Sequence, residues 1–170
     1  MYRRVAASPE DVMAVYADFE GQGRYLPELV TSRVVARLAP GTFQVFYEYE
    51  VSGPNERYTV TVAVARVAKG LEATWDLLSA RYARRLSGAI RVEPLGAGAL
   101  ITYSSRVDPG PLGVHLGSPA SVSRRLRDTV EALTSEVERL RAREPETLAG
   151  LRRRLGGMVQ GIGVAPGGGG

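Results

Sequence analysis

Residues 41–51, GTFQVFYEYEV, alternate between two kinds of side chain. One set, from Phe43 to Val51, is apolar or aromatic, and the positions between are mostly polar. Because successive side chains of a strand point to opposite faces, this period of two predicts a β-strand with one buried face. Tyr47 and Tyr49 lie on that face, although buried positions are more often filled by Val, Ile and Leu. The buried face must therefore also satisfy hydroxyl groups.

The same period of two continues through most of the chain on both sides of this stretch. Short turns rich in glycine, proline and asparagine separate the alternating segments, which is typical of antiparallel hairpins. Each segment has one face more apolar than the other, as in an antiparallel sheet with one buried face. Residues 2–7 supply a short first strand, and the six long strands are predicted over 29–38, 42–52, 56–68, 71–79, 84–93 and 98–107.

Helices are predicted before and after these strands. Ser8 and Pro9 are typical of the cap and first position of a helix, which we expect to end near Phe19 and to be followed by one further turn before Pro27. A long helix is predicted from about residue 118 to Arg143, because apolar residues recur there at steps of three and four. No other element is long enough to cover this stripe, so we expect it to lie on the sheet. The stripe consists of Val122, Leu126, Val130, Leu133, Val137 and Leu140.

The 170-residue chain has the length and composition of one soluble globular domain. It has no cysteine and one histidine, which exclude disulfides and cysteine or histidine metal clusters. All 18 acidic residues precede residue 150, against 19 basic ones there (22 minus Arg152, Arg153 and Arg154), so most of the net charge of +4 lies in the tail. This distribution argues against a nucleic-acid-binding face. With no apparent signal peptide or apolar run of transmembrane length, we expect a cytoplasmic protein.

Two stretches in this order and spacing resemble a known family. Residues 7–29, ASPEDVMAVYADFEGQGRYLPEL, lead from a helix start to Asp-Phe and then Tyr-x-Pro. Residues 85–110, RLSGAIRVEPLGAGALITYSSRVDPG, place Gly88 within one strand and Val-Asp-Pro at the end of the next. Together they resemble the START-like superfamily, in particular its polyketide cyclase/dehydrase branch, also called SRPBCC, over about residues 2–143.

The resemblance implies an α+β helix-grip fold. In this fold a curved antiparallel sheet of six to seven strands wraps around a long C-terminal helix, with two short helices after the first strand. We expect a START-like domain over residues 1–143 and a basic, then Gly-rich tail over 144–170 that is partly disordered. For residues 146–159 a short basic helix and a solvated tail both remain open. The resemblance also implies a cavity between sheet and helix for an apolar ligand, without a cofactor.

The inward aromatic residues are the candidate wall of this cavity. Their rings would contact an apolar ligand while the hydroxyls orient it, and the alternative is ordinary core packing with each hydroxyl finding a backbone partner. Ser105 is a small inward polar group with no evident base to activate it. Arg66 follows the inward phase of its strand and is a candidate partner for a ligand carboxylate, the alternative being that Arg66 and Arg84 reach solvent at strand ends. The predicted ligand-binding residues are Tyr47, Tyr49, Tyr58, Arg66, Trp75, Tyr103 and Ser105.

Three functions remain open from the sequence. The first is binding or transport of an apolar or amphipathic small molecule such as a lipid, quinone or polyketide. The second is an aromatase/cyclase or dehydratase acting in the same cavity, although no catalytic residue is identified. The third is an interaction module, in which Arg152, Arg153 and Arg154 contact an anionic membrane or an acidic protein partner. The apolar side of this segment would be formed by Leu148, Leu151, Leu155 and Met158.

Overall fold

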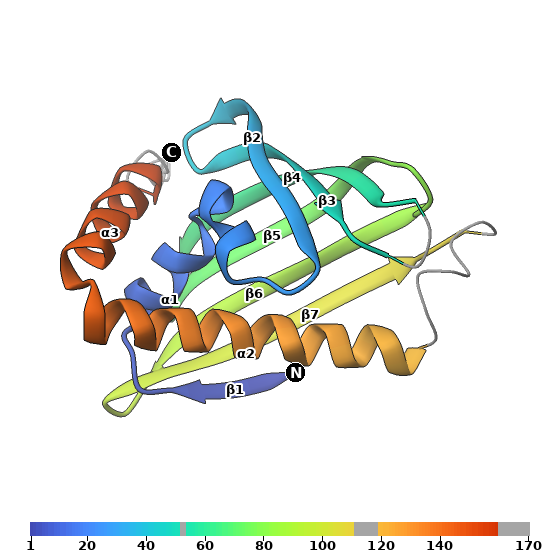
Figure 1. Cartoon of the computed structure of the whole chain (residues 1–170). Coiled ribbons are helices and arrows are strands. Elements are labelled where there is room, and N and C mark those ends of the chain that lie inside the picture. The colour runs from blue at the N-terminus through green and yellow to red at the C-terminus, as the bar shows by residue number, and fades with distance from the viewer. Residues whose placement is uncertain (52–53, 111–118, 160–170) are drawn as a thin grey trace, which may run out of the picture.

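A computed structural model describes residues 1–51, 54–110 and 119–159, and the side chains of 119–122 are not described. Seven antiparallel strands form one sheet in the order β1-β7-β6-β5-β4-β3-β2 (Figure 1). The strands are β1 (Tyr2–Val5), β2 (Leu29–Ala39), β3 (Thr42–Tyr49), β4 (Glu56–Val67), β5 (Gly70–Ala80), β6 (Arg85–Leu95) and β7 (Gly98–Asp108). The helices are α1 (Pro9–Tyr16), the 3-10 helix η1 (Phe19–Arg24), α2 (Pro119–Arg143) and α3 (Pro145–Val159). The predicted α+β helix-grip class is confirmed.

The alternation of the sequence places the strands as predicted. Val60, Val62 and Val64 on the inner face of β4 are at most 2% exposed, and the apolar phases of the neighbouring strands share that face. β3 ends at Tyr49, three residues before the predicted end. Beyond this end, the N–H of Glu50 donates to the carbonyl of Glu28, next to the last pair of β2 and β3, Leu29 and Tyr49.

The long helix α2 crosses one face of the sheet, as Figure 1 shows. Its predicted stripe is buried at Val130, Leu133, Val137 and Leu140, and Leu126 is half-buried. The second half of α2 packs against α1, which begins at the predicted cap: Ser8 Oγ accepts from the N–H of Asp11 at 3.1 Å. At one end of α2, therefore, α1 and η1 lie between this helix and the sheet.

Residues 145–159 form the helix α3, in agreement with the short basic helix considered for 146–159, and α3 packs against α1. Leu148, Leu151 and Leu155 are at most 3% exposed, so the side chains assigned to a membrane-facing surface are largely buried inside the protein. Arg152 contacts the buried carboxylate of Asp11, which ties α3 to the start of α1. Residues 160–170 lie outside the described residues.

The packing of α3 predicts the effect of truncating one of its buried side chains. Leu151→Ala should lower the free energy of unfolding by about 2–5 kcal/mol, because it leaves a cavity between α3 and α1. Chemical denaturation measures this difference. The control is Arg153→Ala on the exposed side of α3, for which a change within roughly 0.5 kcal/mol is expected. Equal small effects of the two substitutions would show that α3 is not part of the cooperative fold.

Candidate functional site

A cavity of about 720 Å³ lies between the inner face of the sheet, the segment formed by α1 and η1, and the first half of α2. Its walls come from β3, β4, β5, β6 and β7 on one side and from Leu126, Thr129 and Leu133 of α2 on the other. The volume is within the usual range for small-molecule sites. The apolar stripe of α2, which was expected to pack directly on the sheet, therefore covers the cavity along part of its length.

Aromatic rings form most of the sheet side of this cavity. Tyr47 and Tyr58 are cross-strand partners with ring centroids 5.4 Å apart, and Tyr49 lies 5.9 Å from Tyr58 with nearly parallel rings. Across the sheet, the rings of Trp75 and Tyr103 are 5.3 Å apart. Offset and tilted pairs at these distances are favourable, so the wall is held together by its own contacts.

Gly88 makes room for the indole of Trp75. The two residues are cross-strand partners in β6 and β5, and a Cβ atom on Gly88 would lie 2.3 Å from Trp75 Cζ2 and 2.4 Å from the carbonyl oxygen of Ser104. A side chain therefore cannot replace the glycine while Trp75 keeps its position. The glycine that contributed to the family resemblance thus has a local packing role.

The structure brings six of the seven predicted site residues to the cavity wall: Tyr47, Tyr49, Tyr58, Trp75, Tyr103 and Ser105. Their contact with a ligand remains a prediction. Arg66 is not brought to the cavity, because its exposed side chain lies at the end of β4 and pairs with Glu10 at 3.4 Å. Arg84 is also exposed and outside the lining. The arginines that do line the cavity are Arg106 of β7 and Arg125 of α2.

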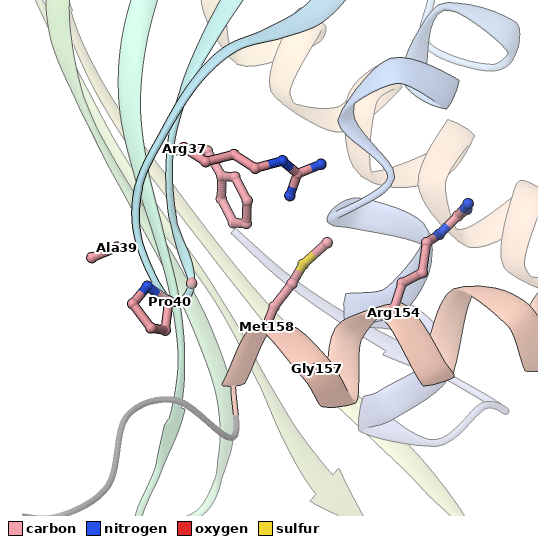
Figure 2. Close-up of a pocket in the computed structure, with 8 residues that line it drawn as sticks. Arg37, Ala39, Pro40, Arg154, Gly157 and Met158 are labelled. Carbon is pink, nitrogen blue, oxygen red and sulfur yellow. The ribbon is translucent and has the colours of Figure 1, made fainter.

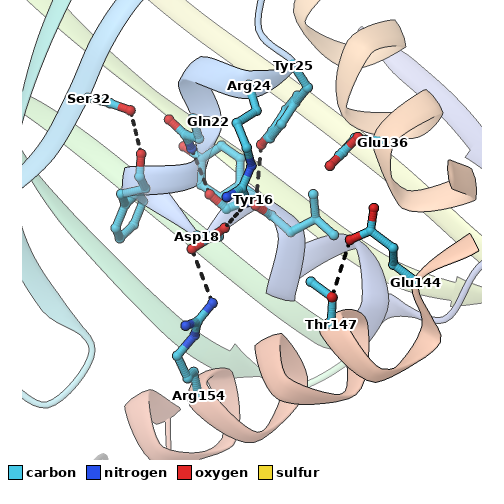
Figure 3. Close-up of polar contacts among 12 residues, drawn as sticks. Tyr16, Asp18, Gln22, Arg24, Tyr25, Ser32, Glu136, Glu144, Thr147 and Arg154 are labelled. Carbon is cyan, nitrogen blue, oxygen red and sulfur yellow. Dashed lines mark hydrogen bonds and ion pairs between the residues drawn. The ribbon is translucent and has the colours of Figure 1, made fainter. Parts of the chain in front are cut away.

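Four lining residues, Tyr16, Gln22, Tyr25 and Leu26, come from the segment that precedes β2. Gln22 Nε2 donates to the carbonyl of Tyr16 at 2.7 Å, and the hydroxyl of Tyr25 donates to the carbonyl of Val15 at 3.3 Å (Figure 3). Ser32 Oγ donates to the carbonyl of Phe19 and fixes η1 to β2. The sequence placed Tyr16 on the apolar side of its helix but gave no signal that η1 would close the cavity.

Glu56 is one of the lining residues that the sequence did not predict, and it is the carboxylate among them. It lies two positions before Tyr58 in β4, so the period of two places it on the inner face, and its side chain is 4% exposed. The N–H of Tyr82 donates to Glu56 Oε1 at 3.4 Å. Glu56 Oε2 is the one fully buried side-chain polar atom in the described part of the chain that has no hydrogen-bond partner.

Burial raises the pKa of both kinds of acid in the cavity, the carboxyl of Glu56 and the hydroxyl groups of the tyrosines. It raises the pKa of Glu56, and the backbone N–H groups of Tyr82 and Ala83 act in the opposite direction. Burial also raises the pKa of Tyr49 to about 12 and the pKa values of Tyr16, Tyr47, Tyr58 and Tyr103 above their usual range. The tyrosines are therefore neutral at pH 7 and act as hydrogen-bonding groups, not as bases.

An ion pair spans one side of the cavity between α2 and the loop before β2. Arg125 Nε lies 3.1 Å from Glu28 Oε2, and both side chains are partly exposed. Glu28 has a backbone φ of 62°, which only a minority of non-glycine residues adopt. This pair places a cation at the cavity rim, the role that the sequence assigned to Arg66.

A smaller cleft of about 450 Å³ lies between the β2–β3 hairpin and the end of α3 (Figure 2). The guanidinium of Arg37 lies 5.3 Å from the ring centroid of Phe43, and Arg154 pairs with Asp18 at 3.3 Å. Both cations that line this cleft are thus already engaged, and the larger cavity is the candidate site.

Two further classes of site were tested on the described residues. Within residues 1–51, 54–110 and 119–159, no group of three His, Cys, Asp or Glu side chains could hold a metal ion. In the same ranges, no helix combines the length and apolar character needed to cross a membrane. His115 lies outside the described residues.

The family follows from comparison with known sequences. A sequence model of a family described as "Polyketide cyclase / dehydrase and lipid transport" matches residues 2–138. The chain belongs to this family. No curated protein sequence matches the chain.

Solved structures of the polyketide cyclase/dehydrase and lipid transport fold are similar to this chain in shape. Zhui aromatase/cyclase from Streptomyces sp. R1128 is 21% identical with a TM-score of 0.67, covering 82% of this chain and 92% of that one. A START superfamily protein from Mycobacterium smegmatis is 22% identical with a TM-score of 0.65, covering 82% and 96%. The di-domain ARO/CYC StfQ of the steffimycin biosynthetic pathway is 18% identical with a TM-score of 0.66, covering 84% of this chain, which spans 45% of StfQ.

The contact between Gly88 and Trp75 predicts a specific spectroscopic change. Gly88→Ala should reduce stability by about 1–3 kcal/mol and move the emission of Trp75, the single tryptophan of the chain, to longer wavelength as the indole is displaced. Gly157→Ala in α3 is the matched control, because its new Cβ meets nothing within 4 Å. Unchanged emission and stability for Gly88→Ala would contradict the packing described here.

The raised pKa of Glu56 predicts a pH-dependent stability difference. At pH below about 4 the carboxyl is protonated in the folded and unfolded states, so Glu56→Gln should change the melting temperature little. As the pH rises above the ordinary pKa of 4.5, the unfolded chain loses this proton more readily than the folded one, and the wild type loses stability relative to the variant. Melting curves from pH 4 to 8 measure the widening gap.

A control with the opposite sign is available on β3. Hydrogen bonds from Asn55 and Arg57 lower the pKa of Glu48, so its ionised form stabilises the fold above its ordinary pKa, and this contribution is lost as the pH falls. Glu48→Gln should therefore destabilise the protein at neutral pH and approach the wild type in acid. If both variants changed stability with pH in the same direction, the assignment for Glu56 would be wrong.

Proposed function

We propose that this protein binds an apolar or amphipathic small molecule, such as a lipid, quinone or polyketide, in the cavity between the sheet and α2. One observation carries the proposal: five aromatic side chains, Tyr47, Tyr49, Tyr58, Trp75 and Tyr103, line an open volume instead of packing into a solid core. The family, whose description includes lipid transport, supports it.

The physical basis of binding would be the burial of apolar ligand surface against the aromatic wall. Each Å² removed from water contributes roughly 25 cal/mol, from which the cost of immobilising the ligand is subtracted. Hydroxyl groups of the tyrosines and Ser105 would fix the orientation of the ligand. Arg125 at the rim is a candidate partner for an anionic group left outside the apolar part of the cavity.

Catalysis by an aromatase/cyclase or dehydratase is the second candidate function. Two structurally similar proteins are described as ARO/CYC or aromatase/cyclase, and Glu56 is a carboxyl with a raised pKa in the cavity wall. Against it, no described side chain is hydrogen-bonded to Ser105 as a base, and the tyrosines are held neutral by burial. Binding without turnover is therefore the function that the site supports best.

A pair of adjacent serines provides the test. Ser105 lines the cavity, and its neighbour Ser104 points to the exposed outer face of β7. Ser105→Phe should fill part of the cavity and weaken the binding of 2-methoxynaphthalene by roughly tenfold or more, since the probe would lose its space. Isothermal titration calorimetry measures the dissociation constants of the wild type and the variant.

Ser104→Phe is the matched control, because it adds the same ring on the opposite face and should leave probe binding unchanged. The absence of probe binding to the wild type would refute the proposal. Equal weakening by both substitutions would place the probe outside this cavity and refute it as well.

A further inference from the structure

Glu56 is a buried ionisable group that the proposed function does not yet use. A buried carboxyl oxygen without a partner is unfavourable, typically by about 1–3 kcal/mol or more. A leucine or valine would continue the inner face of β4, which consists of Tyr58, Val60, Val62 and Val64 beyond this position. Within the described residues, therefore, the fold gains no evident stability from the carboxyl.

No described cation forms a direct ion pair with Glu56. Burial raises the pKa of this carboxyl and the charge of Arg81 lowers it, but Arg81 Nη1 donates to the carbonyl of Asn55 at 3.0 Å and not to Glu56. Oε1 accepts one long hydrogen bond from the N–H of Tyr82, and Oε2 accepts none. The carboxyl thus keeps one unpaired acceptor, Oε2, which is fully buried in this conformation. The cavity wall around it is mainly aromatic and apolar, with a few polar residues such as Gln22, Ser105 and Arg106.

We propose that Glu56 is the polar recognition group of the cavity and accepts a hydrogen bond from a hydroxyl or N–H group of an otherwise apolar, ring-containing ligand. This inference rests on the proposed binding function. Because Oε2 is fully buried, the inference requires that the side chain of Glu56 rotates about its broad terminal torsion when a ligand enters, so that an oxygen faces the cavity. Tyr49 is the cross-strand partner of Glu56. The rings of Tyr49 and Tyr58 line the same cavity and are placed to contact a ring attached to the donor.

The charge of the carboxyl favours one class of ligand over another. A hydroxyl supplies the donor that Oε2 lacks, and hydrogen bonds to a charged group are about twice as strong as neutral ones. The carboxylate of a fatty acid would place like charge beside Glu56 and supply no proton at pH 7. The site therefore favours phenol-like or enol-like donors over anionic lipid ends at this position.

Two probes that share the same rings, one with a hydroxyl donor and one with that hydroxyl methylated, test the proposal. The probe 2-naphthol carries a hydroxyl, and 2-methoxynaphthalene has the same rings without a donor. Wild-type protein should bind 2-naphthol about tenfold more tightly at pH 7, as expected for one hydrogen bond to a charged acceptor. In Glu56→Gln the amide N–H₂ replaces the free acceptor by a donor, so the preference should fall below about threefold.

Two further variants test whether the lost preference for 2-naphthol is specific to the carboxyl of Glu56. Glu50→Gln makes the same chemical change on an exposed residue and should keep the wild-type preference. Glu56→Leu removes both oxygens, should abolish the preference, and provides a second variant if the amide disturbs the fold; circular dichroism checks each. A preference that persists in Glu56→Gln and Glu56→Leu, or equal wild-type affinity for both probes, overturns the inference but leaves the binding function intact. Failure of both probes to bind overturns both proposals.

Discussion

The structure depends on how one end of α2 is fixed. Val137 and Leu140 are buried where α2 meets α1, and α1 is in turn covered by α3 through Leu148, Leu151 and Leu155. The carboxylate of Asp11 joins these helices, because it contacts Arg152 of α3 and lies 3.9 Å from Arg141 of α2. A buried carboxylate needs such partners, and removing one of them is costly. With this end packed, the other half of α2 is held over the sheet without touching all of it, and the cavity is what remains between them.

Much of this arrangement could be predicted from the sequence because strands encode their faces directly. The period of two identified the strands and placed Tyr47, Tyr58 and Tyr103 on the inner face, where the structure has them. The same alternation, extended from Tyr58 by two positions toward the start of β4, would also have placed Glu56 on the inner face. The alternation was not sufficient to place Arg66. It does not show that the end of β4 lies outside the cavity, where a long side chain is free to reach Glu10.

The parts that could not be predicted depend on contacts between distant segments. The sequence of 146–159 left a short basic helix and a solvated tail both open, and only the contact with α1 makes this segment a packed helix. Phe46 is explained in the same way: on the outer face of β3, its ring lies 5.0 Å from the guanidinium of Arg33, a favourable cation–π contact across the β2–β3 pair. Neither partner could be chosen from local periodicity.

The residues of the cavity wall have two physical roles: they provide apolar contact area, and they distinguish one ligand from another. Aromatic rings stabilise each other along the wall and present apolar surface, so they favour many ligands to a similar degree. Discrimination needs a group whose hydrogen bond is lost with the wrong ligand, since an unpaired buried polar atom is more unfavourable than a poor apolar contact. Glu56 Oε2 meets that condition among the described residues, and the tyrosine hydroxyls, kept neutral by burial, are able to both donate and accept. The aromatic wall would therefore supply affinity, and a carboxyl that weakens the empty fold would supply selectivity.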